Sequence, residues 1–337
     1  MSVFLVGLFL GTLFLPGAMN GPMSIMDVNG PVAVEQRTVF WFTVGVSAFL
    51  LLTVGGVFLY AIFRFRAKPG QDFHVPEQTH GSAKVEVALI VASCLLLLVI
   101  AIPNAKALFY VSEVPEARKA EQIKVIAIGH QWWWEFQYPD LGITTANELH
   151  IPVGKPIDLQ IKAVDVIHAF WVPRLAGKID ATPGQINTMW MEASEPGTYK
   201  GQCTEYCGDS HANMRFLVMA EKQEDFDTWA RNTKKDGAKP STVEEVNGQQ
   251  VFMKGCNSCH TVGGSGAMGV VGPNLSHFGS RTTLGAGIYV SNEENLTNWI
   301  KFPKQMKPGN LMNLEQVNMV VSDKDVKDLV AYLKSLK

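Results

Sequence analysis

The sequence predicts a multidomain protein in which a two-helix transmembrane hairpin precedes an all-β sandwich and then an all-α domain. Three observations predict this order. Two long uncharged apolar stretches lie before residue 106, short β-rich stretches bounded by Gly, Pro and Asn begin at Ile123, and an amphipathic helical pattern ends the chain. A chain of 337 residues has room for two or three domains. The segments that we assign are an N-terminal segment at 1–36, the transmembrane hairpin at 37–106, the sandwich domain at 107–230, a linker at 231–247 and the helical domain at 248–337.

The apolar stretches near the N-terminus differ in length, and length separates their roles. Residues 3–15 are too short to span a bilayer and resemble the core of a signal peptide, although the usual basic residues before such a core are missing. Both cleavage of this segment and its retention at the membrane remain open. Residues 38–63 and 87–105 contain 26 and 19 uncharged residues, enough for each to cross a bilayer. Cys94 lies in the last stretch and is expected to be a small buried hydrophobe.

The loop between the two long apolar stretches predicts the orientation of the hairpin. Its basic residues are Arg64, Arg66, Lys68 and Lys84. By the positive-inside rule this loop faces the cytoplasm, so everything after residue 106 is extracytoplasmic. The lipid bilayer is therefore the first partner that the sequence predicts.

The middle and the end of the chain carry two other local patterns. Residues 123–128, 157–163 and 216–220 are rich in strand-forming residues, and the turns between them predict an antiparallel sandwich. Near the C-terminus, four apolar residues recur at the spacing of one helix face. They are Val326, Leu329, Val330 and Leu333. Ser322, with Asp325 three positions later, predicts the cap at the start of this helix.

The charge balance excludes one class of partner and predicts an attraction within the chain. The formal net charge is −2, which does not favour nucleic-acid binding. Residues 107–230 hold 10 basic and 17 acidic side chains, whereas residues 248–337 hold 9 basic and 6 acidic ones. The two segments should attract each other across a flexible tether, 231–247, whose end-to-end distance is about 20–25 Å. We expect a weak contact between them that salt weakens further.

The pentapeptide Cys256-Asn-Ser-Cys259-His260 predicts a covalently attached haem of the c type. The two thiols bond to the porphyrin, and His260 becomes one axial ligand of the iron. Attachment of such a haem implies an extracytoplasmic compartment. A thioether as the sixth ligand would raise the haem potential. The candidates for this ligand are Met306, Met312 and Met319.

A second metal signature, Cys203-Thr-Glu-Tyr-Cys207-Gly-Asp-Ser-His211-Ala-Asn-Met214, lies upstream of the haem motif. Two thiolates, an imidazole and a thioether on a β-sandwich indicate copper in electron transfer. Two neighbouring thiolates can bridge two copper ions, and two ions need a second imidazole, for which His168 is the best candidate. A strained disulfide or a zinc site is the alternative, but zinc more often uses Cys-x2-Cys spacing without an ordered Met.

This copper motif resembles the binuclear CuA site of cytochrome c oxidase subunit II. The family pattern is Cys-x-Glu-x-Cys-Gly-x-x-His-x-x-Met with one upstream His, and the sequence matches it throughout. The resemblance implies two bridging thiolates and one pair of outer ligands for each copper. These are Cys203 and Cys207, then His168 with Met214, and His211 with the backbone carbonyl of Glu205.

The same resemblance extends to residues with other roles. The Glu205 side chain in such proteins reaches a non-redox Mg²⁺ or Mn²⁺ at the junction with subunit I. In Gly129-His-Gln-Trp132-Trp-Trp-Glu, the first tryptophan matches the residue that lies on the surface above the copper and admits the electron, although clustered aromatics also fill cores. Glu86 matches an acidic residue at the mouth of a proton channel, although a carboxylate at a helix N-terminus is also favourable to the helix dipole.

The C-terminal domain resembles the class I cytochromes c. Gly272-Pro-Asn-Leu275 follows the haem motif as in that family, where the proline segment packs beside the proximal His. Lys307-Pro-Gly-Asn-Leu-Met312 resembles the family's ligand loop and favours Met312 as the sixth ligand, although Asn313 stands where the family often has Pro. Two membrane helices, a cupredoxin-like domain and a fused cytochrome c domain together resemble subunit II of a bacterial caa-type cytochrome c oxidase.

The resemblance implies a function and a set of partners. The chain would be the electron-transfer subunit of a terminal cytochrome c oxidase: it accepts electrons on haem c and passes them to binuclear CuA and on to the haem of subunit I, where oxygen is reduced to water with proton pumping. The oxygen-reducing centre lies in that partner and not in this chain. Further partners are subunit III and an external cytochrome or other small redox-protein donor. The expected location is a bacterial inner membrane, with both soluble domains on its periplasmic side.

Other functions fit parts of the pattern. The first alternative is the electron-entry subunit of a CuA-containing nitric oxide reductase, which the neighbouring catalytic subunit would reveal. Quinol oxidase subunits lack the copper cysteines, which are present here as Cys203 and Cys207. A metallochaperone or copper-storage protein has no need of a covalent haem, and nitrous oxide reductase lacks the membrane hairpin.

Overall fold

The computed structural model describes residues 20–66, 70, 77–78, 80–312 and 320–337. The chain forms two compact units, of which Glu35–Val111 is the smaller; the larger joins the N-terminal segment up to Val34 with Ser112–Lys337. The signal-like residues 3–15 and the candidate ligand Met319 lie outside the described residues. The domain limits assigned from the sequence stay predictions.

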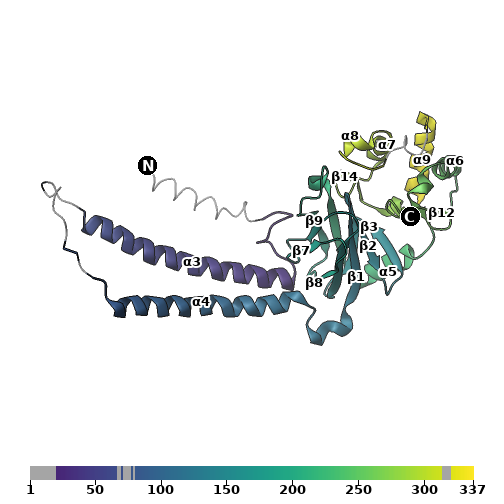
Figure 1. Ribbon diagram of the computed structural model, residues 1–337. Coiled ribbons are helices and arrows are strands. Elements are labelled where there is room, and N and C mark those ends of the chain that lie inside the picture. Colours follow the sequence, from purple (N-terminus) through teal and green to yellow (C-terminus); the bar gives the residue numbers. More distant parts are fainter. Residues whose placement is uncertain (1–19, 67–69, 71–76, 79, 313–319) are drawn as a thin grey trace. The chain divides into compact units, whose positions relative to one another are not determined.

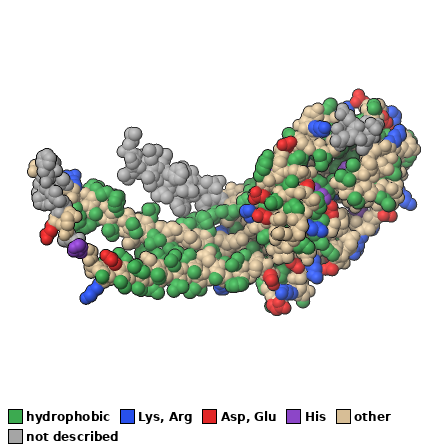
Figure 2. Space-filling view, in the orientation of Figure 1, with side chains coloured by type: hydrophobic (Ala, Val, Ile, Leu, Met, Phe, Trp, Pro, Cys, Tyr) green, Lys and Arg blue, Asp and Glu red, His purple; other side chains and the backbone are tan. Residues whose placement is uncertain are grey.

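The two long apolar stretches form helices, α3 (Pro31–Arg64) and α4 (Ala83–Ser112) (Figure 1). Both are long and apolar enough to cross a membrane, and at 1.5 Å per residue each is longer than the roughly 30 Å hydrocarbon core. Their apolar side chains point outward, as Leu51 and Phe109 do, and hydrophobic atoms cover these helices in Figure 2. The two predicted apolar helices are therefore confirmed. The predicted burial of Cys94 is wrong, because α4 presents this side chain outward rather than to a protein core.

The larger unit contains a β-sandwich of two five-stranded sheets (Figure 1). One sheet has the strand order β3-β2-β1-β5-β8, and the other has the order β4-β10-β9-β6-β7. The strands are β1 (Ile123–His130), β2 (Trp133–Tyr138), β3 (Ile143–Ala146), β4 (Glu148–Pro152), β5 (Ile157–Ala163), β6 (His168–Trp171), β7 (Lys178–Ala181), β8 (Asn187–Met191), β9 (Gly197–Cys203) and β10 (Arg215–Glu221). A short 3-10 helix, η1 (Glu116–Glu121), precedes them. The predicted all-β sandwich is confirmed.

Each sheet contains one parallel pair, so the prediction of a purely antiparallel sandwich is wrong. β1 runs parallel to β5, with Ile123 opposite Ile157, and β4 runs parallel to β10, with Glu148 opposite Leu217. The cause is the connectivity: between the paired strands the chain visits the opposite sheet and then returns in the original direction. The other neighbouring strands of the two sheets are antiparallel.

The core between the sheets is aromatic at its end nearest His168. Trp134, Phe136, Phe170 and Phe216 are completely buried. Their rings lie at centroid distances between 4.6 and 6.4 Å, mostly edge to face. The Trp134 ring also packs against the imidazole of His168, with the two ring centroids 6.0 Å apart. Interlocked rings of this size bury much apolar surface and pack rigidly. They form an aromatic floor beneath the imidazole of His168 that limits its movement.

The C-terminal part is helical with two small hairpins. Its elements are α6 (Val243–Met253), η3 (Cys256–Ser258), β11 (Thr261–Val262), β12 (Ala267–Met268), η4 (Phe278–Ser280), β13 (Thr283–Leu284), β14 (Tyr289–Val290), α7 (Glu293–Lys301), α8 (Pro303–Met306) and α9 (Asp323–Ser335). The predicted C-terminal helix is confirmed as α9, and its four stripe residues are buried. Ser322 and Asp325 form the predicted cap, each side chain accepting from the other's backbone N–H.

The predicted linker at 231–247 contains more regular structure than its composition indicated. The helix α5 (Gln223–Thr233) ends inside it, and α6 begins inside it with a reciprocal cap between Thr242 and Glu245. Residues between these helices also contact the C-terminal domain, as Gly237 N–H donates to the carbonyl of Gly263 at 3.1 Å. The connection is therefore shorter and more restrained than a flexible tether of that length.

Candidate copper and haem centres

Paired strands and one loop bring the predicted copper donors together. His168 begins β6 and Cys203 ends β9, and these two strands are hydrogen-bonded neighbours. Cys207 lies on the loop between β9 and β10, which a short 3-10 helix, η2 (His211–Asn213), shapes before Met214 returns the chain to the sheet. The strands thus fix two donors, and the loop folds the other three over them.

The donor atoms lie close to one another. Cys203 Sγ is 3.7 Å from Cys207 Sγ and 3.9 Å from His168 Nδ1. Cys207 Sγ is 3.5 Å from His211 Nδ1 and 3.9 Å from Met214 Sδ. Because metal–thiolate bonds are about 2.3 Å long, two sulfurs at this separation can both bond the same ion. Among the described residues, His168, Cys203 and Cys207 form the one compact group of His, Cys, Asp and Glu donors, all within 4.8 Å.

The backbone of Glu205 also faces the cluster. Its carbonyl oxygen lies 3.3 Å from Cys203 Sγ, so the position predicted for a carbonyl ligand is next to a thiol. A thiol, an imidazole, a thioether and a carbonyl form a mixed donor set that suits copper better than the hard cations. The residues present therefore fit a copper centre. The role of the Glu205 side chain toward Mg²⁺ or Mn²⁺ stays a prediction.

A second layer of contacts orients His168. Its Nε2 lies 2.8 Å from Asp165 Oδ1, which leaves Nδ1 directed at Cys203. Burial alone would lower the pKa of His168, but the bonds to Asp165 and Cys203 outweigh it and raise the pKa. On the other side of the ring, a Cβ at Gly129 would lie 2.7 Å from the imidazole Cδ2, so only glycine lets β1 approach this closely.

The two cysteine sulfurs share a proton rather than ionising independently. Hydrogen bonding from Cys207 lowers the pKa of Cys203 to about 4, despite the opposing effect of burial. The same bond raises the pKa of Cys207, because a second thiolate beside the first would be repelled. A cation bound between the sulfurs would remove this repulsion and release the remaining proton.

Trp132 lies next to the copper loop but not on an open surface. Its indole N–H donates to the carbonyl of Cys207 at 2.9 Å. The side chain is buried, because the backbone of Gly309 from the C-terminal domain lies against the ring. The expectation of an exposed tryptophan is therefore wrong for this chain, since the fused domain covers it. Its predicted role in electron entry stays a prediction.

The haem motif forms one tight turn at the mouth of a cavity. Both Cys259 and His260 donate their backbone N–H to the carbonyl of Cys256, at 3.2 and 3.0 Å. Burial raises the pKa of Cys256 to about 11, so its sulfur is held protonated in apolar surroundings. The turn places both cysteines and the histidine along the same cavity.

The proline segment lies beside His260, as the resemblance to class I cytochromes c implies, and here it also fixes the tautomer of that ring. His260 Nδ1 lies 2.8 Å from the carbonyl oxygen of Pro273, which can only accept, so Nδ1 carries the proton. Burial lowers the pKa of His260, with the bond to Pro273 partly opposing it. The neutral ring therefore keeps Nε2 free as a donor to a metal.

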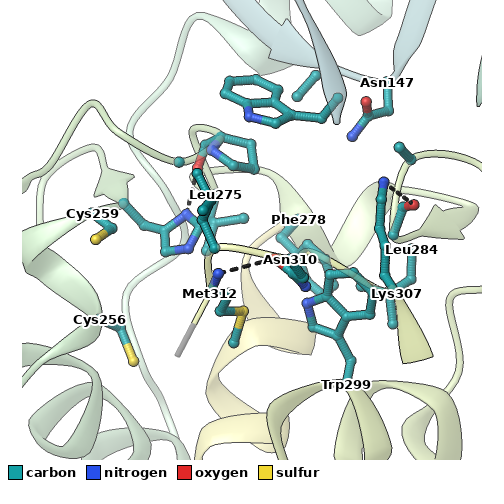
Figure 3. Close-up of a pocket in the computed structure, with 18 of the residues that line it drawn as sticks. Asn147, Cys256, Cys259, Leu275, Phe278, Leu284, Trp299, Lys307, Asn310 and Met312 are labelled. Carbon is teal, nitrogen blue, oxygen red and sulfur yellow. Dashed lines mark hydrogen bonds between the residues drawn. The ribbon is translucent and has the colours of Figure 1, made fainter. Parts of the chain in front are cut away.

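The cavity has a volume of about 390 Å³ and an apolar lining (Figure 3). Leu275, Phe278, Leu284 and Trp299 are among its walls, and Met312 lines it as well. Met306 does not line it, and Met319 lies outside the described residues, so the geometry agrees best with Met312 as the sixth ligand. An apolar hollow with a histidine, a methionine and two cysteines on its walls fits a covalent haem.

Comparison with known proteins agrees with both sites. The family description "Cytochrome C oxidase subunit II, periplasmic domain" matches residues 142–221, and "Cytochrome c" matches residues 245–337. Cytochrome c oxidase subunit 2 of Alkalihalophilus pseudofirmus is 37% identical over 97% of this chain and 94% of its own length. The protein from Bacillus sp. strain PS3 with the same name is 32% identical over 96% and 94%.

The chain belongs to the cytochrome c oxidase subunit 2 family. It is thus part of a haem-copper oxidase, and its cytochrome c domain is fused behind the copper domain. Quinol oxidase subunit 2 of Bacillus subtilis is also similar, at 30% identity, but the match covers only 74% of this chain. The matched family domains imply copper in the first and haem in the second.

The structure places the remaining predicted residue, Glu86, without testing its role. Glu86 lies in the first turn of α4, where a carboxylate favours the helix dipole. Its role at a proton channel stays a prediction. Sequence reasoning missed three residues of this subunit 2 chain that contact the sites: Asp165, Ser210 and Lys307. Of these, only Asp165 had a local signal, because it stands three positions before His168.

Proposed function

We propose that this chain takes up electrons at its haem domain and delivers them through its copper domain to subunit I of a terminal cytochrome c oxidase. The observation that carries the proposal is the contact between the two centres. The indole of Trp132 lines the haem cavity and donates to the carbonyl of Cys207, one of the predicted copper ligands. A single buried side chain thus touches both sites.

The residues have distinct roles in this proposal. Haem c and binuclear copper supply the one-electron chemistry when bound. Cys203, Cys207, His168, Met214, His211 and the carbonyl of Glu205 would hold the copper pair. Cys256 and Cys259 would attach the haem, and His260 and Met312 would bind its iron. Burial of the copper donors under the loop excludes water, which keeps the rearrangement on electron transfer small.

The chain's own polar groups hold these ligands in place. Asp165 fixes the ring of His168 through Nε2, and Pro273 fixes that of His260 through Nδ1. Each ring therefore presents one defined nitrogen to its metal. Pre-oriented ligands need little reorganisation when the charge of the centre changes, which favours rapid electron transfer in both domains.

We extend this proposal to the wider assembly. We place α3 and α4 in a bacterial inner membrane, with both soluble domains on the periplasmic side. Subunits I and III are the partners in the membrane, and an external cytochrome or other small redox protein is the donor. Oxygen reduction and proton pumping take place in subunit I, with Glu205 reaching a Mg²⁺ or Mn²⁺ at its interface and Glu86 lying near a proton entrance.

Metal analysis of the purified oxidase, combined with electron paramagnetic resonance, tests this proposal. We expect copper and c-type haem in this chain in a ratio of about two to one, and a copper signal split equally by two nuclei. The variant Cys207→Ser should lose that signal but keep its haem. A mononuclear copper spectrum, or a catalytic partner that reduces nitric oxide rather than oxygen, would overturn the proposal.

A further inference from the structure

Two ionisable side chains are buried between the copper domain and the haem domain, and neither is a predicted metal ligand. Glu148, at the start of β4, is 3% exposed, and Lys307, in the loop before Met312, is 4% exposed. Buried ionisable groups are strongly unfavourable unless they are hydrogen-bonded. The hydrogen-bond partners of these two side chains therefore show which groups join the two domains.

Glu148 accepts four hydrogen bonds from the haem domain through one oxygen. The backbone N–H groups of Thr282 and Thr283 donate to Oε1, both at 2.9 Å. Their hydroxyls donate to the same oxygen at 2.7 and 2.9 Å. A carboxylate oxygen with four donors is fully compensated for its burial, and all four donors come from the other domain.

Lys307 makes the corresponding contact in the other direction: it belongs to the haem domain and contacts the Trp132 segment of the copper domain. Its Nζ donates to the carbonyl of Trp132 at 2.6 Å and to that of Gly285 in its own domain at 3.0 Å. The next residue, Pro308, accepts from the hydroxyl of Ser210 in the copper loop. Lys307 thus ties the haem-ligand loop to the indole segment that reaches Cys207.

The backbone at Gly309 completes this contact. Its φ is +74°, and a Cβ there would lie 2.5 Å from the Trp132 ring. Glycine is therefore required both for the turn and for the close approach. A further backbone bond, from Arg215 N–H to the carbonyl of Ala286 at 3.1 Å, joins the domains between the other two contacts.

Hydrogen bonds with neutral groups satisfy Glu148 and Lys307, and the buried guanidinium of Arg281 in the haem domain adds an electrostatic attraction to Glu148. Arg118–Glu192 and Lys301–Asp323 are ion pairs that each join two groups of a single domain. Dissolved salt screens exposed charges but has little effect on buried hydrogen bonds. The geometry does not match a contact driven by the opposite net charges of the two segments.

We propose that Glu148 and Lys307 form a polar latch that holds the haem domain on the copper domain in one fixed, salt-insensitive orientation. The latch depends on the chain's own contacts, whereas its value as a permanent electron path rests on the proposed function. In this arrangement the tethered domain does not search for its partner, because Trp132 stays between the haem cavity and Cys207. The latch replaces the weak, salt-sensitive contact expected from the sequence.

Amide hydrogen exchange of the purified oxidase tests the latch directly. Peptides that cover residues 282–286 should be protected, and to the same degree at low salt and at about 1 M salt. The variant Glu148→Gln should speed their exchange by about tenfold, which corresponds to about 1.4 kcal/mol. The matched control is Glu192→Gln, a buried carboxylate whose partner Arg118 lies in the same domain, and it should leave these peptides unchanged.

A second pair of variants examines the latch at its other end. Gly309→Ala should expose the same interface, because its new Cβ meets the Trp132 ring. Gly266→Ala is the control, since Gly266 also has a positive φ, +84°, but a Cβ there meets nothing within 4 Å. Protection that disappears at high salt, or equal exchange in each variant and its control, would overturn the latch.

The two proposals can fail separately in the same sample. Exchange is measured in the resting protein and does not depend on electron transfer. If the purified protein contained no copper but its 282–286 peptides were protected from exchange, only the proposed function would be contradicted. Intact metal centres with unprotected 282–286 peptides would contradict the latch alone.

Discussion

The copper site and the haem site are built in opposite ways by the same chain. The copper donors already lie 3.5–3.9 Å apart, held by paired strands and by the aromatic core beneath His168. The haem-binding groups instead surround a cavity of about 390 Å³. The polypeptide alone assembles the first site, whereas the second needs a large group to complete its core.

This difference assigns the stability of each domain to a different source. Apolar core residues of the haem domain line this hollow, so a bound haem completes their packing. The sandwich core, in contrast, is closed beneath its metal donors. The haem domain should therefore depend on its group for folding, and the copper domain should not.

The largest predicted effect is loss of the haem domain's fold without haem. The double variant Cys256→Ser, Cys259→Ser cannot attach haem and should lose cooperative unfolding of α6 and α9, because the core residues around the haem then lack the group against which they pack. Hydrogen exchange in these helices measures the effect. The sandwich strands serve as the internal control and should keep their protection. Full protection of α9 in the variant would show that the haem domain folds without haem.

Removal of a copper donor should have the reverse signature. Cys207→Ser should abolish the binuclear copper spectrum and leave the fold of both domains intact, because the sandwich core does not include the metal. Copper titration and circular dichroism measure the two properties. Cys94→Ser, on α4, is the control for a change of sulfur to oxygen outside the site. Unfolding of the sandwich in Cys207→Ser would remove the contrast between the sites.

Removal of the residue that orients His168 should have a smaller effect on copper binding. Asp165→Asn keeps the shape but weakens the bond to His168 Nε2, so copper affinity should fall by about 10–100-fold. Competition with a chelator measures the change. Asp158→Asn, on β5 of the same domain, serves as the control. Equal copper affinity in both variants would show that the aromatic floor alone orients the ring.

The last prediction concerns the pH dependence of stability and the haem-ligand loop. Burial lowers the pKa of Lys307 to about 7, with the electrostatic effect of Cys207 partly opposing it, whereas an unfolded lysine titrates near 10.4. Between these values the unfolded chain binds the extra proton, so this group makes stability rise with pH, by at most about 1.4 kcal/mol per unit.

Denaturant unfolding at several pH values compares Lys307→Met with the parent. The variant should have the shallower pH dependence between pH 7 and 10, because its side chain does not titrate. Lys301→Met, which removes a partly exposed lysine of the same domain, is the control and should keep the parental slope within that range. Identical slopes for Lys307→Met and the parent would mean that this amine stays charged in the folded protein.

Local spacing predicted the features that depend on near neighbours in the sequence. The apolar runs, the strands at 123–128 and 157–163 and the cap at Ser322 could be found because each pattern lies within a few residues. The copper loop from Cys203 to Met214 is equally local, so its donor set was predicted before any distance was known.

Contacts between distant segments could not be predicted in this way. The bonds from Lys307 to Trp132 and from Thr282 to Glu148 join residues 175 and 134 positions apart. Net charge suggested attraction between the two domains, but it could not show which buried groups make the contact. The burial of Trp132 follows from the same docking and was missed for the same reason.

The most direct test of the account is intramolecular electron transfer in the purified oxidase. After rapid photoreduction of the haem, its reoxidation should match the reduction of copper, with one first-order rate that is independent of protein concentration and unchanged between low and high salt. A rate that depends on protein concentration, or copper that stays oxidised while the haem loses its electron, would contradict a relay through one latched chain.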